Sequence, residues 1–179
     1  MALSPFLATA KRLDELVSTL DPRPQVLLFC SAARVLLGDR AGDTEDALVA
    51  TYEFAVTGRV PDGTPRTLAA PAESGEVDTV TLDALICADI ALQIAHGEVK
   101  AQDAVWYVLE PQFQATSERL FGFTDVGSER EERDEAVALR DPTLARAVDA
   151  VETTVAELSA EPTEQQAAMA AEALRPLRP

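Results

Sequence analysis

Apolar residues recur at helical spacing along this chain, in segments that proline and glycine bound. The clearest segment spans 144–158, where apolar side chains follow one another at steps of four and three: Leu144, Val148, Val151, Val155 and Leu158. This spacing places them on one face of an α-helix and suits packing along a neighbouring helix at a shallow angle. The preceding Asp141-Pro142 pair is typical of a helix start. Patterns typical of β-strands are scarce.

Similar signals elsewhere predict an all-α, single-domain bundle of seven or eight helices over residues 1–179. Ser4-Pro5 is typical of an N-cap and a first helical position. Residues 26–37 are apolar on most faces of a helical wheel, which predicts a central buried helix. Thr163 and Gln166 have the spacing of a capping box, so a last helix is expected to begin there.

The breaks between helices give further expectations. Residues 58–78 contain three prolines and three glycines, which predicts a long loop, and the VPDGT motif at 60–64 is compatible with a short hairpin. Pro111 lies within a helical pattern at roughly 100–121 and is expected to kink that helix, because proline removes an amide donor. We expect the termini, residues 1–4 and 176–179, to fray.

The charge of the chain is strongly negative. There are 31 acidic and 15 basic residues among 179, for a net charge of −16. Phosphate backbones are bound by lysine and arginine, so this composition argues against a nucleic acid or an anionic membrane surface as a partner. A basic protein partner is the expected alternative, and the charge could also serve solubility alone.

The charge is also unevenly distributed. Residues 1–42 have a net charge of +1, residues 43–110 of −10 and residues 125–164 of −8. The nearly neutral first two helices could supply a face for self-association, so the sequence leaves the oligomeric state open.

We expect a soluble, cytoplasmic protein. The first 20 residues lack the apolar core and the early positive cluster of a signal peptide, and no apolar run reaches the ~18 residues that a membrane span needs. Cys30 and Cys87 each lie within an apolar helical pattern, which favours buried free thiols.

No motif predicts a catalytic residue, a cofactor or a metal. The chain has one histidine, and its two cysteines are 57 positions apart, without CxxC or HxxxH spacing. The patterns GxSxG, GxGxxG and GxxxxGK[ST] do not occur. A magnesium or calcium site made only of carboxylates stays open.

One polar stripe interrupts the otherwise apolar helix expected at 79–96. Asp89, Gln93 and His96 fall on one side of it, and Asp89 and His96 are two turns apart, about 10 Å along the axis, so direct contact between them is not expected. The stripe could line a ligand pocket, or it could reach solvent or pair with a neighbouring helix. Trp106 is a further candidate for ligand contact, with core packing as the alternative.

A charged run at 128–135 offers candidate partner-binding residues. They are Glu129, Glu131, Glu132, Asp134 and Glu135. Such a run is also typical of a solvated helix face.

The order of these parts resembles the YjaG-like family of small bacterial all-helical proteins of unknown function. The resemblance covers about residues 25–160 and is carried by six segments: 29–37, 47–55, 81–92, 97–105, 114–120 and 139–158. It implies a helical bundle with no assigned activity, and it implies no catalytic residue.

Two functions follow as hypotheses. The first is a non-catalytic acidic protein that binds a basic protein, as toxin-neutralising immunity proteins do, or that acts as a regulator. The second is a small-molecule-binding protein or an enzyme with a pocket near Asp89, Gln93 and His96.

Overall fold

Proline and glycine mark several helix ends in the computed structural model. The structure describes residues 4–68, 78–98, 104–122 and 129–179, with Asp43 and residues 129–132 described by their backbone alone. The helices are α1 (Pro5–Ser18), α2 (Pro22–Leu37), α3 (Glu45–Thr57), α4 (Thr79–Ala95), α5 (Val105–Phe121), α6 (Glu129–Ala138), α7 (Pro142–Glu157) and α8 (Glu164–Ala173). Short 3-10 turns lie at Gly38–Arg40, Gly42–Thr44 and Arg175–Leu177. The described residues contain no β-strand, so the expected all-α bundle is confirmed.

The helix starts follow local capping chemistry. The Asp141 side chain accepts a hydrogen bond from the Thr143 N–H at 2.9 Å, and Thr163 and Gln166 form the predicted capping box. At the C-terminus of α3, Gly58 ends the helix with φ of 75°, a left-handed conformation that glycine adopts without steric cost. These local signals explain why the helix boundaries could be anticipated.

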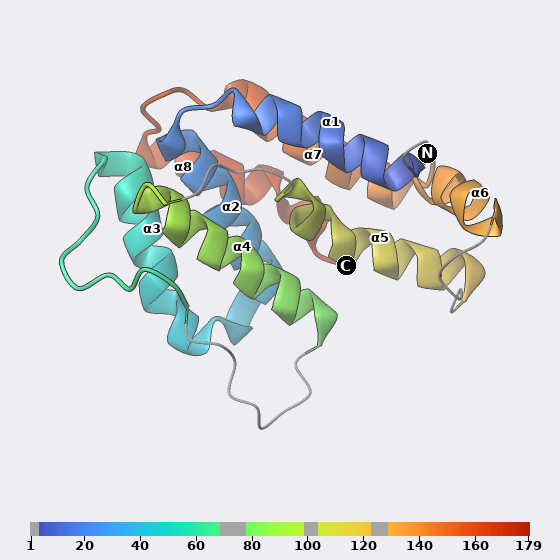
Figure 1. Cartoon of the computed structure of the whole chain (residues 1–179), viewed down its shortest axis with the longest axis horizontal. Coiled ribbons are helices and arrows are strands. Elements are labelled where there is room, and N and C mark those ends of the chain that lie inside the picture. The colour runs from blue at the N-terminus through green and yellow to red at the C-terminus, as the bar shows by residue number, and fades with distance from the viewer. Residues whose placement is uncertain (1–3, 69–77, 99–103, 123–128) are drawn as a thin grey trace.

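The centre of the molecule is α2. It packs against α3, α4 and α8, and α4 crosses in front of it (Figure 1). Neighbours on several sides explain its sequence, because Leu27, Leu28 and Phe29 point in different directions around the helix and all three are fully buried. The prediction of a central buried helix at 26–37 is confirmed.

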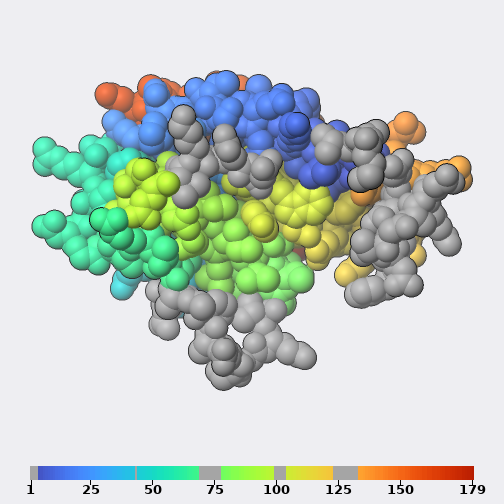
Figure 2. Space-filling model, in the orientation of Figure 1, coloured from blue at the N-terminus to red at the C-terminus, as the bar shows by residue number. Residues whose placement is uncertain are grey.

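The remaining helices build the other half of the bundle. Helices α1 and α7 run side by side, α5 packs beneath them against α4, and α6 lies at the ends of α1 and α5 (Figures 1 and 2). Aromatic rings join α1 to α5: Phe6 stacks on Phe113 with ring centroids 4.0 Å apart and meets the Trp106 ring edge-on at 4.7 Å.

Several helix ends in this fold are capped by side chains from other helices. Buried Asp14 of α1 accepts hydrogen bonds through Oδ1 from the N–H groups of Ala104 and Val105, at 3.0 and 2.9 Å, where α5 begins. Glu135 of α6 accepts one from the Phe6 N–H of α1 at 3.0 Å. Amides at a helix start have no partner within their own helix. These contacts therefore join the start of α5 to α1 and the start of α1 to α6.

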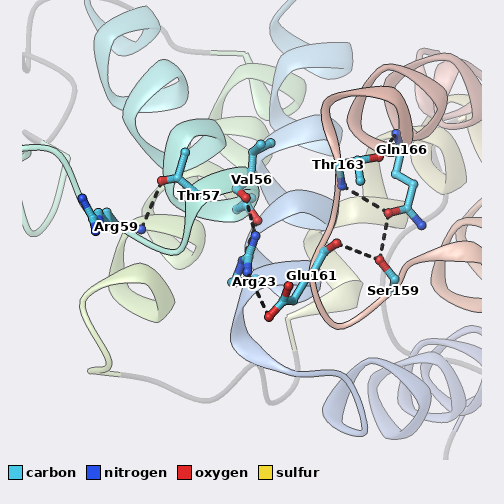
Figure 3. Close-up of polar contacts among 9 residues, drawn as sticks. Arg23, Val56, Thr57, Arg59, Ser159, Glu161, Thr163 and Gln166 are labelled. Carbon is cyan, nitrogen blue, oxygen red and sulfur yellow. Dashed lines mark hydrogen bonds and ion pairs between the residues drawn. The ribbon is translucent and has the colours of Figure 1, made fainter.

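Arg23 of α2 plays the corresponding part at a helix C-terminus. Its guanidinium donates to the carbonyl oxygens of Ala55, at 2.9 Å, and Val56 in the last turn of α3, and it lies 3.9 Å from a carboxylate oxygen of Glu161 in the turn between α7 and α8 (Figure 3). A positive charge at this end also complements the helix dipole.

Two expectations about chain ends and loops need correction. The C-terminal tail is packed rather than frayed, because Leu177 is fully buried. Residues 1–3 lie outside the described part, whereas Ser4 caps α1. The hairpin expected at 60–64 is a single turn, closed by the Thr64 N–H to the Pro61 carbonyl at 3.2 Å, with no strand pairing between residues 58 and 68; residues 69–77 lie outside the described part.

Helix α5 runs through Pro111 without ending there. The two thiols are free and buried as expected, and burial raises the pKa of Cys30 to about 12 and raises that of Cys87 as well. None of the helices within the described residues combines the length and apolar character needed to cross a membrane.

Candidate functional site

The polar stripe of α4 forms hydrogen bonds to an irregular segment of the chain, residues 59–68. Asp89 accepts a hydrogen bond from the Leu68 N–H through Oδ1 at 2.7 Å, and its Oδ2 accepts one from Gln93 Nε2 at 2.5 Å. His96 Nε2 lies 3.1 Å from the Pro65 carbonyl oxygen, and since a carbonyl only accepts, this ring nitrogen carries the proton. The stripe therefore supports a loop.

The structure brings Asp89, Gln93 and His96 to one surface of α4, as their spacing predicts. Trp106 lies apart from them, on α5, where its ring packs on Phe6 and its Nε1–H donates to Glu110. The four candidate ligand-binding residues thus do not form one constellation. Asp89 and His96 hold the 59–68 segment, Gln93 bonds Asp89, and Trp106 joins α1 to α5.

The 59–68 segment also forms one wall of an open cleft of about 570 Å³, and α3 forms the other wall. On α3 the lining residues are Asp46, Val49, Ala50 and Glu53, which share one helix face at i, i+3, i+4 and i+7 spacing, together with Ala47 beside them. From the segment come Pro61, Asp62 and Leu68 among others. Cleft and stripe are linked by Leu68, whose N–H is held by Asp89 and which lines the cleft.

The cleft is acidic at its rim and partly apolar within. Asp46, Glu53 and Asp62 line it, and among the described residues no lysine, arginine or histidine does so. Val49 adds apolar surface and is 48% exposed. Three carboxylates around an apolar surface can bind a cationic group while the carbon chain beside that group is withdrawn from water.

These three acidic residues are not among those that the sequence singled out. The spacing of Asp46 and Glu53 on either side of Val49 and Ala50 is a signal that could have identified an acidic face with an apolar centre. Asp62 could not be found in this way, because its place opposite α3 depends on the contacts that α4 makes with the loop.

One residue of the charged run at 128–135 has a structural role. Glu135 caps α1 through the Phe6 amide, and Asp134 is half-buried. The side chains of Glu129, Glu131 and Glu132 lie outside the described part, so partner binding by this run stays a prediction.

A second acidic group lies between α4 and α5. Asp83 is 5% exposed, and its Oδ2 has no hydrogen-bond partner among the described residues. Burial, followed by repulsion from Glu110, raises the pKa of Asp83 to about 7. Within the described residues, no group of three or more histidine, cysteine, aspartate or glutamate side chains is arranged to hold a metal ion.

Replacing Asp89 by alanine is expected to free the 59–68 segment without unfolding the bundle. The change removes the acceptor of the Leu68 amide, and a hydrogen bond to a charged group is worth about 1.5–3 kcal/mol. Trypsin should therefore cut after the exposed Arg59 and Arg66 at least about tenfold faster under native conditions. Asp149→Ala, on the exposed face of α7, removes the same charge and serves as the control. Equal cleavage rates in both variants would show that Asp89 does not hold the loop.

Comparison of the chain with protein-family models, with curated proteins and with solved structures gives no match. The resemblance to the YjaG-like family therefore stays a prediction, and the acidic cleft is the feature that bears on function.

Proposed function

We propose that this protein is a non-catalytic interaction protein that binds a basic segment of a protein partner in the cleft between α3 and residues 59–68. One observation carries the proposal: within the part of the chain that the structure describes, three carboxylates and no basic residue line the cleft. Its volume of about 570 Å³ lies within the range of ligand sites, about 300–1,000 Å³.

The shape of the cleft favours a chain segment as the occupant. It is open along one side, and its acids come from both walls, Asp46 and Glu53 from α3 and Asp62 from the loop. An extended basic segment can place one cationic side chain on each wall and keep its backbone in solvent. The apolar surface of Val49 and Ala50 then packs against the carbon stems of those side chains.

The charge of the whole chain supports the same partner. A net charge of −16 attracts a basic protein over several ångströms and raises its rate of association, by about 10–10³-fold for a well-steered pair. Covering the basic surface of a partner is also how an immunity-like or regulatory protein acts, and this role is part of the proposal.

Binding of a fluorescein-labelled arginine–glycine peptide, followed by fluorescence anisotropy, tests the proposal. We expect the triple variant Asp46→Asn, Glu53→Gln, Asp62→Asn to bind the peptide at least about tenfold more weakly, a loss of about 1.4 kcal/mol. The matched control is Glu15→Gln, Glu118→Gln, Asp149→Asn, three exposed acids outside the cleft. It changes the net charge equally and should bind within about twofold of the parent.

Comparing the two triple variants distinguishes binding in the cleft from a general effect of net charge. If both triple variants weaken binding equally, the peptide responds to net charge alone and the cleft is not the site. If the parent binds the peptide no better than a glycine–serine peptide at physiological salt, the proposal is overturned. Circular dichroism of all three proteins confirms that the comparison concerns folded chains.

A further inference from the structure

A second hollow lies between α7 and α8, on elements that do not contribute to the acidic cleft. It is a groove of about 390 Å³. Leu158 and Met169 are the large apolar side chains in its lining, and the short side chains of Ala170 and Ala173 also line it. Glu157 also lines it, and the lining residues in the described ranges include no basic side chain.

The groove is held open by the turn that joins the two helices. Ser159 donates a hydrogen bond to Gln166 Oε1 at 2.8 Å, and Gln166 Nε2 donates to the Glu157 carbonyl oxygen at 3.0 Å. Thr163 closes the capping box with Gln166, and Glu161 pairs with Arg23 of α2 (Figure 3). The contacts of Gln166, itself a lining residue, therefore help to fix the spacing of α7 and α8, and they form without an occupant.

Met169 makes the groove unusual for a protein surface. It is 50% exposed, the largest exposed fraction among the large apolar side chains of the described residues. Methionine is flexible and polarisable, and it is common on surfaces that receive apolar side chains of a partner. A groove between two helices with apolar side chains in its lining can receive the apolar face of an amphipathic helix.

The charge around the groove defines the partner. Residues 142–173 contain six acidic residues and one basic residue, Arg146. Arginines outside this range pair with Glu152, Glu161 and Glu172, so the excess negative charge comes from Asp149, Glu157 and Glu164. A second copy of this chain docked face to face would bring the same excess of negative charge against itself, which costs free energy. A helix with lysine or arginine beside its apolar face meets the opposite charge at Glu157, which lines the groove.

We propose that the α7–α8 groove is a docking surface for a basic amphipathic helix of another protein, with the apolar face of that helix against Leu158 and Met169. This site is independent of the acidic cleft, since the two share no lining residue. It recognises a folded apolar face, whereas the cleft recognises extended positive charge.

A synthetic amphipathic peptide of leucine and lysine at helical spacing tests the groove by fluorescence anisotropy with the full chain. We expect Met169→Glu to weaken its binding at least about tenfold, because the change places a charge where leucine side chains would be buried. The control is Leu16→Glu, which makes the same kind of change at a 40% exposed site on α1 and should leave binding within about twofold. A scrambled isomer of the peptide, without an apolar face, should bind at least about tenfold more weakly to the parent.

Three outcomes would overturn the proposal. Equal weakening by Met169→Glu and Leu16→Glu would mean that the peptide adsorbs to exposed apolar residues in general. Equal binding of the scrambled isomer would mean that charge alone is recognised. Sedimentation showing a parent dimer that Met169→Glu converts to a monomer would assign the groove to a second copy. The triple variant of the acidic cleft should bind this peptide like the control triple variant, so failure at one site leaves the other testable.

Discussion

Replacing Asp14 by alanine is expected to lower the free energy of unfolding by about 3 kcal/mol, the largest effect that we anticipate for a single polar side chain here. The Asp14 carboxylate accepts hydrogen bonds from two N–H groups at the start of α5, those of Ala104 and Val105, and all three residues are buried. Alanine leaves both amides without this acceptor in a place that water does not readily reach. Urea unfolding followed by circular dichroism measures the loss.

The conservative variant tells hydrogen bonding from charge. Asp14→Asn keeps one acceptor oxygen and should lose roughly half as much stability as Asp14→Ala. Glu15→Ala, at the exposed neighbouring position, should change the unfolding free energy by less than about 0.5 kcal/mol. A loss below about 1 kcal/mol for Asp14→Ala would mean that the start of α5 does not depend on α1.

Replacing Asp83 by asparagine is expected to stabilise the protein at alkaline pH. The unfolded chain releases the proton of this carboxyl near pH 3.9, whereas the folded chain holds it until its pKa of about 7. The contribution of Asp83 to stability is therefore complete below about pH 4 and is lost as the pH rises through 7. Asparagine stays neutral at every pH and does not bear this loss.

The size of the effect follows from the same linkage. A shift of three pKa units corresponds to about 4 kcal/mol as an upper bound, and relaxation around the charge reduces the expected gain for Asp83→Asn to about 2 kcal/mol at pH 8.5. At about pH 4 the two proteins should have equal urea midpoints. Parallel stability curves for parent and variant from pH 4 to 9 would show that Asp83 is not protonated in the folded state at neutral pH.

The helices could be predicted because their signals are local. Ser4, Asp141 and Thr163 each cap the helix that follows within three residues, and proline and glycine mark the breaks. The RPLRP tail suggests fraying by its composition, but Leu177 is fully buried and its 3-10 turn packs against α2, α5 and α7. Local composition predicts an element, whereas burial decides whether an end is ordered.

The site could be predicted only in part, for the same reason. The wheel correctly grouped Asp89, Gln93 and His96, because their spacing is a property of one helix. Their actual partners, the amide of Leu68 and the carbonyl of Pro65, lie 21 and 31 positions away in a segment without regular structure. No periodicity encodes such a contact, and the acidic cleft that depends on it was missed with it.

The capping between helices also has a consequence for the order in which the nascent chain can fold. The acceptor of the Phe6 amide, Glu135, lies 129 positions later in the chain. At a synthesis rate of about 5–20 residues per second, Glu135 is made roughly 6 to 26 seconds after Phe6. Helices α2, α3 and α4 can assemble on the ribosome during this interval, whereas the Phe6 amide of α1 gains its acceptor only when α6 emerges.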